Sequence, residues 1–412
     1  MIQGISMPTS PTDIHSDSAL DVAAVVVALR TVLEELHVPH SLHQPLFQGN
    51  EWAYVKDCID SGWVSSVGSY VDKFEKSVAE FTGAKHAVVV VNGTAALQIA
   101  LKLAGVQSGD EVLTPALTFV ATANAVAYCG AIPHFVDSEF RSLGLDPQKL
   151  DDYLKDIAEL ITDGCRNRIT GRRIRAVVPM HTFGHPVDMD PLVELCARWK
   201  IEIVEDAAEG FGSYYKGRHT GTLGHIGILS FNGNKIVTTG GGGALLFNDE
   251  SEARVAKHIT TTARRPHPWT YFHDQLGYNF RMPNLNAALG CAQLEQMPAF
   301  LSSKRNLAAR YIEAFRDVPG IKFAVEPVFA RSNYWLNALL LDEEFADQRD
   351  LLLEQTNRQG IMTRPVWVLM HRLPMYQNCP RMDLGVAESL ERRIVNIPSS
   401  AAPDAAAGAQ HV

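Results

Sequence analysis

The sequence predicts an α/β protein built on a mostly parallel β-sheet that is covered by helices. Short apolar runs rich in β-branched residues alternate along the chain with segments of helical spacing, which is typical of such sheets. The clearest run, His86-Ala-Val-Val-Val-Val91, is followed by the turn Asn92-Gly93-Thr94 and a helical pattern over 95–103. A run this uniformly apolar indicates a strand that is buried on both faces.

The remaining elements follow in order. Apolar residues at helical spacing predict helices over 52–59 and 71–81, before the first strand. Further strands are predicted at residues 111–114, 132–136, 174–179, 201–205, 226–231 and 244–247, with a helix over 119–128. Strands at 321–323 and 335–341 and a helix over 345–359 then predict a smaller C-terminal α+β domain. We therefore divide the chain into a partly disordered N-terminal segment (1–42), a large domain (43–285) and a small domain (286–412) with a mobile tail.

Composition excludes several classes of protein. A net charge of −9 over 412 residues argues against nucleic-acid binding, which needs a basic face. The six cysteines are scattered without a C-x-x-C pair, so we expect reduced thiols, no disulfide frame and no metal site. No signal core and no apolar run of membrane-spanning length occurs in the sequence. We expect a cytoplasmic protein with no membrane partner.

A single lysine, Lys235, lies five residues after Ser230 and just before the glycine run Gly240 to Gly243. An amine held in a glycine-rich turn suits covalent chemistry on the aldehyde of pyridoxal phosphate (PLP). The alternative is a solvated lysine on a surface loop, and this segment alone does not decide between them.

The other strand ends carry groups that complement this amine. Gly93 and Thr94 open a helix directly after a strand, where free N–H groups suit a phosphate, although an ordinary helix cap has the same pattern. Phe119 follows the next strand and could stack on a flat ring or belong to the core. Asp206 ends the run Ile201-Glu-Ile-Val-Glu205, and its carboxylate could pair with a pyridinium N–H or cap a helix. Because strand ends of a parallel sheet share one edge, we expect Asp206 and Lys235 to face the same cleft.

Longer segments resemble the sugar-nucleotide aminotransferases of the DegT/DnrJ/EryC1/StrS family, PLP enzymes of fold type I, the aspartate aminotransferase-like fold. The resemblance extends from about residue 45 to 400. It is carried by residues 109–124, 181–190, 205–208, 230–243 and 277–288. Residues 49–52, 61–68 and 364–371 are similar to the branch that makes nonulosonic-acid precursors such as legionaminic acid.

The resemblance implies a role for each matching position. Lys235 would bind the cofactor covalently, Asp206 would face its ring nitrogen and Phe119 would stack on its ring. The remaining cofactor contacts that it implies are Gly93, Thr94 and Ser230 at the phosphate, Glu209 near the ring hydroxyl, and Asn279, which reaches the phosphate of a partner subunit. Many members have Gln or His where this chain has Glu209, which leaves the role of that side chain open. The substrate contacts that we expect are Arg281, Arg364, His371 and Tyr376, with Arg264 and Arg265 as further candidates for a diphosphate.

The activity implied is transfer of an amino group from L-glutamate to a nucleotide-linked keto-deoxy-sugar by a homodimer with shared active sites. The expected acceptor is C4 of a UDP- or GDP-linked 4-keto-6-deoxy-N-acetylhexosamine. Two alternatives are a PLP-dependent sugar dehydratase of the same fold and a non-catalytic regulator. The dehydratases have histidine at the lysine position, and a regulator would be expected to lose Asp206 or Lys235, so both residues favour the aminotransferase. A nicotinamide-dependent dehydrogenase is disfavoured because the turn after Val91 lacks G-x-G-x-x-G.

Overall fold

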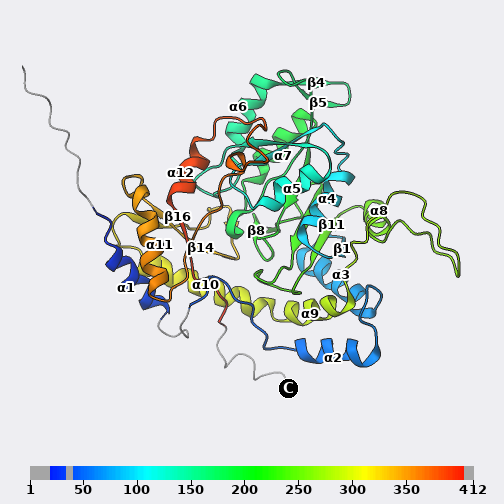
Figure 1. Ribbon diagram of the computed structural model, residues 1–412, viewed down its shortest axis with the longest axis horizontal. Coiled ribbons are helices and arrows are strands. Elements are labelled where there is room, and N and C mark those ends of the chain that lie inside the picture. Colours follow the sequence, from blue (N-terminus) through cyan, green and yellow to red (C-terminus); the bar gives the residue numbers. More distant parts are fainter. Residues whose placement is uncertain (1–18, 34–39, 403–412) are drawn as a thin grey trace, which may run out of the picture.

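The computed structural model describes residues 19–33 and 40–402. The predicted disorder near the N-terminus and the predicted mobile tail fall on residues 1–18, 34–39 and 403–412, which lie outside the described residues. Of the N-terminal segment, the described part forms helix α1 (Val22–Leu33), which packs in one apolar cluster with the C-terminal part of the chain (Figure 1).

The α/β fold class is confirmed by a large central sheet. Within the described residues this sheet has nine strands, seven of them in the order β1-β11-β10-β7-β6-β2-β3. The bounds of these seven are β1 His86–Val90, β2 Glu111–Pro115, β3 Ile132–Val136, β6 Arg173–Val177, β7 Glu202–Asp206, β10 Ile226–Ser230 and β11 Gly243–Phe247. All neighbouring pairs are parallel except those of β11, which runs antiparallel to both β1 and β10. The carboxyl ends of β1, β10 and β7 therefore lie at one edge of the sheet.

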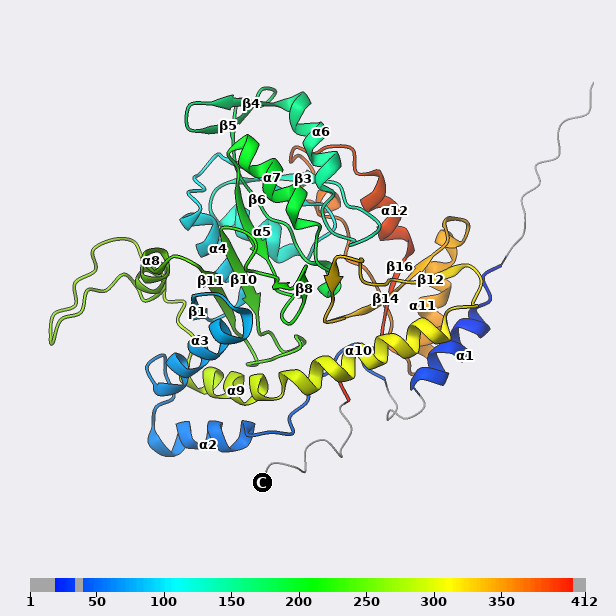
Figure 2. The ribbon, with the colours of Figure 1, turned by 180° about the vertical axis from the view of Figure 1, so that it is seen from behind.

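Both faces of this sheet are buried under helices, which explains the uniformly apolar strand at residues 86–91. Val88 and Val90 face an apolar cluster with α4, α5 and α8, whereas Ala87 and Val89 face a cluster with α3 and α9. The helices of this part are α2 Glu51–Ser61, α3 Ser69–Thr82, α4 Gly93–Leu103, α5 Val120–Tyr128, α6 Pro147–Ile157, α7 Met189–Trp199, α8 Glu250–Thr260 and α9 Asn284–Glu295. Figure 2 shows the sheet between α4 and α5 on one side and α3 and α7 on the other.

A second, four-stranded sheet lies in the C-terminal part of the chain. It has the order β12-β14-β16-β15, with β12 Ile321–Phe323, β14 Asn337–Leu341, β15 Arg364–Pro365 and β16 Ile394–Ile397. The helices around it are α10 Met297–Ala314, the 3₁₀ turns η2 Glu343–Gln348 and η3 Met370–Arg372, α11 Arg349–Arg358 and α12 Gly385–Arg393. Helix α10 follows α9 directly and extends from the large sheet to this second sheet (Figure 2). The domain boundary between residues 285 and 286 stays a prediction.

Several elements were not predicted, among them β15, β16 and α12 and the small features that follow. The hairpin β4 Ala158–Ile161 and β5 Gly164–Asn167 extends the large sheet beyond β6. A three-stranded sheet joins β8 Tyr214–Tyr215 and β9 Arg218–His219 to β13 Ala330–Arg331, which links the two parts of the chain. The 3₁₀ turn η1 Thr182–Gly184 follows β6.

Glu205 lies near the end of β7, is fully buried, and accepts four hydrogen bonds through its carboxylate. It accepts hydrogen bonds from the backbone N–H groups of Gly221, Leu223 and Gly224, and from His181 Nε2 at 2.8 Å. Burial alone would raise the pKa of this carboxyl, but the bonds from His181 and the backbone hold it below its ordinary value. Glu205 thus ties β7 to the turn at residues 219–224, directly beside Asp206.

We predict that Glu205→Gln lowers the free energy of unfolding at neutral pH by about 2–4 kcal/mol. The amide cannot accept all of these hydrogen bonds, and it places an N–H₂ group against buried donors. Urea unfolding followed by circular dichroism measures this change. Glu202→Gln is the matched control, because Glu202 lies on the same strand with its side chain 45% exposed and should cost less than about 1 kcal/mol. Equal losses in the two variants would contradict the anchoring role of Glu205.

Candidate active site

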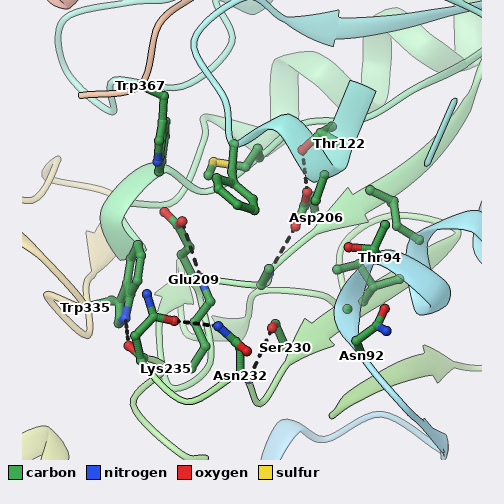
Figure 3. A pocket seen from close by; sticks show the side chains of 18 residues that line it. Asn92, Thr94, Thr122, Asp206, Glu209, Ser230, Asn232, Lys235, Trp335 and Trp367 are labelled. Atoms are coloured by element: carbon green, nitrogen blue, oxygen red, sulfur yellow. Dashed lines mark hydrogen bonds and ion pairs between the residues drawn. The ribbon is translucent and has the colours of Figure 1, made fainter. Parts of the chain in front are cut away.

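A cavity of about 290 Å³ lies at the carboxyl ends of β1, β7 and β10. Its polar lining comes from large-sheet strand ends and the turns that follow them, and its apolar lining includes two tryptophans from the C-terminal part of the chain (Figure 3). The lining residues are Asn92, Gly93, Thr94, Leu97, Phe119, Ala121, Thr122, Met180, Asp206, Ala208, Glu209, Ile228, Ser230, Asn232, Asn234, Lys235, Trp335 and Trp367. Seven of the eight predicted cofactor positions therefore line one cavity, and the eighth, Asn279, does not.

Lys235 follows β10 and turns its amine back into this cavity (Figure 3). Its Nζ lies 3.4 Å from Glu209 Oε1 and 3.8 Å from the centroid of the Trp335 ring, a cation–π distance. The indole N–H of Trp335 donates to the backbone oxygen of Asn234, which holds the ring against the lysine turn. The amine is thus placed by one carboxylate and one aromatic face.

Glu209 is itself almost fully buried, with 3% of the residue exposed. Its Oε2 accepts a hydrogen bond of 2.9 Å from the backbone N–H of Phe183. Burial raises the pKa of this carboxyl to about 7, although the Lys235 amine and the Phe183 N–H act in the opposite direction. A carboxyl with this pKa can hold or release a proton near neutral pH.

Asp206 ends β7, next to β10 in the sheet, as the sequence predicted from neighbouring strand ends. Its carboxylate accepts hydrogen bonds from Thr122 Oγ1 at 2.9 Å and from the backbone N–H of Ala208 at 3.2 Å. Burial raises the pKa of this carboxyl, and those two donors lower it. The carboxylate faces the cavity with acceptor capacity that these two donors leave free.

The turn after β1 forms the far end of the cavity. Asn92 caps helix α4 by accepting from the Ala95 N–H at 2.7 Å, and the half-buried Gly93 and Thr94 begin the first turn of the helix at the cavity. A Cβ on Gly93 would lie 3.0 Å from Ser230 Cβ, and a Cβ on Gly243 would lie 2.7 Å from Gly93 N. The glycines at these two positions therefore let the ends of β1, β10 and β11 come together around a helix N-terminus, which binds anions.

These residues fit PLP in three separate ways. A helix N-terminus with hydroxyls suits the phosphate, the buried Asp206 carboxylate suits a pyridinium N–H, and the Lys235 amine suits the aldehyde. Phe119 precedes α5 and is 51% exposed although it lines the cavity, so one face of its ring is available for stacking.

The predicted substrate residues lie elsewhere in this subunit. Arg364 is exposed on β15 and bonds to Asn357, while the Tyr376 hydroxyl bonds to Asn124 and His371 is buried beside Glu388. Neither Asn279 nor the arginines Arg264, Arg265 and Arg281 are among the cavity-lining residues. Their roles as cofactor or substrate contacts stay predictions.

Sequence reasoning did not identify Thr122, Trp335 and Trp367, which also line the cavity. Thr122 could have been found from the helical spacing, because it lies about one helical turn after Phe119 and both residues line the cavity. Trp367 lies in the segment 364–371 that carries the resemblance, but neither tryptophan could be placed at the cavity, because both come from at least 100 residues after Lys235 and reach it through tertiary packing.

Comparison with known proteins agrees with this geometry. The chain is 38% identical to the GDP-perosamine synthase of Escherichia coli O157:H7, over 87% of this chain and 92% of that relative. It is 36% identical, over 88% of this chain and 92% of the relative, to EpsN of Bacillus subtilis strain 168, whose name describes a pyridoxal phosphate-dependent aminotransferase.

Solved structures extend the likeness to the whole fold. The aminotransferase TlmJ from Streptoalloteichus hindustanus superposes with a TM-score of 0.78 at 29% identity, covering 87% of this chain and 93% of that structure. Residues 46–407 match the DegT/DnrJ/EryC1/StrS aminotransferase family. The chain belongs to this family of PLP-dependent sugar aminotransferases.

Proposed function

We propose that this enzyme transfers an amino group from L-glutamate to C4 of a nucleotide-linked 4-keto-6-deoxy-sugar. The observation that carries the proposal is the gathering of Lys235, Asp206 and the Gly93–Thr94 turn in one cavity. The Lys235 amine also argues against the dehydratase alternative, in which this position is a histidine. The GDP-perosamine synthases among the relatives favour a GDP-linked acceptor, and residues 49–52, 61–68 and 364–371 favour a UDP- or GDP-linked N-acetylhexosamine on the way to legionaminic acid.

In the proposed mechanism, bound PLP supplies an electron sink for the carbanion that forms at the amino-acid Cα. Lys235 would hold the cofactor through its Nζ, and the same amine is placed to move a proton at the amino-acid Cα. Asp206 would hold a proton on the ring nitrogen, and Gly93, Thr94 and Ser230 would bind the phosphate. Glu209 lies within reach of Nζ and can exchange a proton with it.

The cavity of one subunit is poorly equipped for a substrate diphosphate. Among the described residues that line it, Lys235 is the single cationic side chain, and Asp206 and Glu209 are carboxylates. We therefore propose that a second copy of the chain supplies positive charge, with Asn279 at the phosphate and Arg264, Arg265 or Arg281 at the diphosphate.

An exposed arm at residues 264–277 supports this homodimer. It follows α8 and projects from the body of the subunit (Figures 1 and 2). It exposes Trp269 and Leu276 by 81% each and Tyr271 by 75%, and Arg264 stacks over the Tyr271 ring at 4.4 Å. Aromatic and arginine side chains exposed together are typical of interfaces.

A cytoplasmic location is part of the proposal. All six cysteines of the chain are free, and five of them are buried. Unpaired cysteines are the rule in a reducing compartment. No helix among the described residues is long and apolar enough to cross a membrane.

The first prediction from this proposed function tests the reaction itself. Purified enzyme incubated with glutamate and a panel of GDP- and UDP-linked 4-keto-sugars should release 2-oxoglutarate with at least one acceptor, as measured by coupled assay and mass spectrometry. Lys235→Ala should lose the visible absorbance of the bound cofactor and lower turnover by at least about a thousandfold. Retention of both by the variant would overturn the assignment of Lys235, and a panel without any product would overturn the acceptor class.

The second prediction concerns Glu209. Because its pKa in the folded apoenzyme is about 7, above its ordinary value of 4.5, the native state binds the extra proton, and stability attributable to this group falls as pH rises from about 5 to 7. Glu209→Gln lacks this titrating group. The difference in unfolding free energy, variant minus wild type, should therefore increase by about 2–3 kcal/mol between pH 5 and pH 7. Urea unfolding of both apoproteins between pH 5 and 8 measures the difference. A constant difference would show that Glu209 does not titrate in this range.

The third prediction tests the shared sites. Lys235→Ala and Asn279→Ala should each be nearly inactive alone, because one lacks the reacting amine and the other a phosphate ligand. If Asn279 acts on the partner's site, hybrids formed by mixing the two after mild unfolding have one complete site, and activity should return to about a quarter of the wild-type value. Recovery should be absent when either variant is refolded alone. Failure of the mixture to recover, with hybrids verified by affinity tags, would place Asn279 in its own subunit's site.

A further inference from the structure

Two buried threonine hydroxyls lie in sequence behind the cavity, and the second of them bonds to the Asp206 carboxyl. Thr122 Oγ1 lies 2.9 Å from Asp206 Oδ2, and Thr118 Oγ1 lies 2.8 Å from Thr122 Oγ1. Thr118 is fully buried, Thr122 is 1% exposed and Asp206 is 4% exposed. Figure 3 shows the Thr122 hydroxyl pointing at the carboxylate from the helix above it.

The direction of these hydrogen bonds follows from the charge of Asp206. An ionised carboxylate can only accept, so the proton of Thr122 must point to Asp206 Oδ2. The Thr122 oxygen is then free to accept, and the distance of 2.8 Å means that Thr118 donates to it. If Asp206 were protonated, this order would lose its charged acceptor, and the bond would weaken to one between neutral groups.

The backbone fixes both threonines where this order is possible. Thr118 precedes helix α5 and Thr122 lies in its first turn, where its N–H bonds to the Phe119 carbonyl. The five residues from Thr118 to Thr122 therefore carry both hydroxyls and also Phe119, which lines the same cavity. One short segment thus positions both Phe119, whose ring could stack on the cofactor, and Thr122, which donates to the Asp206 carboxylate.

Without Thr122 the Asp206 carboxylate would keep one donor within the protein, the Ala208 N–H at 3.2 Å. Burial already raises the pKa of Asp206 and favours its neutral form. A carboxylate with fewer donors competes more strongly for a proton that it shares with a bound partner. In this cavity that partner is the protonated ring nitrogen of the cofactor.

We propose that Thr122, oriented by Thr118, is a positioning residue that keeps Asp206 ionised, so that the shared proton stays on the ring nitrogen of bound PLP. The inference rests on the proposed function in one respect, that Asp206 faces the ring nitrogen. It adds a reason for the sequence Thr118-Phe119-Val-Ala-Thr122, in which hydroxyls are placed on either side of the stacking ring. A threonine that served packing alone would have no influence on this proton.

The test reads the proton directly and needs no turnover. Wild-type and variant apoenzymes are reconstituted with pyridoxal phosphate that carries a heavy-nitrogen label in its ring, and the ring-nitrogen resonance is recorded by NMR. Thr122→Val should shift the resonance toward the deprotonated value, with about a tenfold fall in the ratio of protonated to deprotonated nitrogen, as expected for loss of one charge-assisted hydrogen bond. Thr122→Ser keeps the hydroxyl and should restore the wild-type resonance.

Thr114→Val is the matched control. Thr114 is fully buried on β2, and its hydroxyl has no hydrogen-bond partner among the described residues, so the same isosteric change should leave the resonance unchanged. Thr118→Val should shift the resonance in the same direction as Thr122→Val but by about twofold to threefold in ratio. This variant also serves if Thr122→Val does not fold.

Two results would overturn the proposal. One is a folded, cofactor-loaded Thr122→Val with the wild-type resonance, and the other is an equal shift in Thr114→Val. Failure of the proposed function would appear differently. If Asp206 does not face the ring nitrogen, Asp206→Asn would leave the resonance of the otherwise wild-type enzyme unchanged, and a wrong acceptor sugar would not affect the resonance at all.

Discussion

The arrangement of the site depends on the hydrogen-bond donors that surround two adjacent carboxyl groups, Glu205 and Asp206, at the buried end of β7. Each would be neutral in an apolar interior, so each needs donors from different elements. Successive side chains of a strand point to opposite faces, and accordingly Glu205 is bonded by His181 and the turn at 219–224, whereas Asp206 is bonded from α5 and faces the cavity. The contrast in their pKa directions, lowered for Glu205 and raised for Asp206, reflects the number of donors around each. The protein supplies four donors to Glu205 and two to Asp206, so the Asp206 carboxyl keeps more acceptor capacity toward the cavity.

The electrostatic balance of the cavity follows from this arrangement. Asp206 and Glu209 contribute acidic groups, and Lys235 contributes the amine that lies between Glu209 and the Trp335 ring. A carboxyl whose pKa is about 7 can take up a proton when the amine is engaged and return it when the amine is free, which limits the change in charge inside a small volume. The other end of the cavity suits anions, because the first turn of α4 supplies N–H groups there and its lining residues are not acidic. The ionisable side chains Asp206, Glu209 and Lys235 are therefore kept apart from the partial positive charge of the α4 N-terminus.

Much of this could be predicted from the sequence, because the large sheet is built from local patterns. The strand at 132–136 was predicted at its observed bounds, and Asp206 and Lys235 could be paired since consecutive strands of a parallel sheet are commonly neighbours. Features set by packing between distant segments could not be predicted. Trp335 reaches Lys235 only because the segment 332–336 crosses from one sheet to the other, and β4–β5 departs from the simple alternation. Arg364, expected as a substrate contact, bonds to Asn357 in this structure, and its role stays a prediction.

The crossing segment at residues 332–336 explains how two separately packed parts of the chain form one cavity. The Asn333 side-chain amide donates to the backbone oxygens of Glu209 and Phe211, and its Oδ1 accepts from the backbone N–H of Trp335. Space for that side chain exists because residue 184 is glycine, where a Cβ would lie 1.9 Å from the Asn333 oxygen. Each of these bonds is buried, so a shift of the second sheet relative to the first would leave several polar groups unpaired. These bonds of Asn333, together with the bond from the Trp335 indole N–H to the Asn234 oxygen, therefore hold the Trp335 ring beside Lys235.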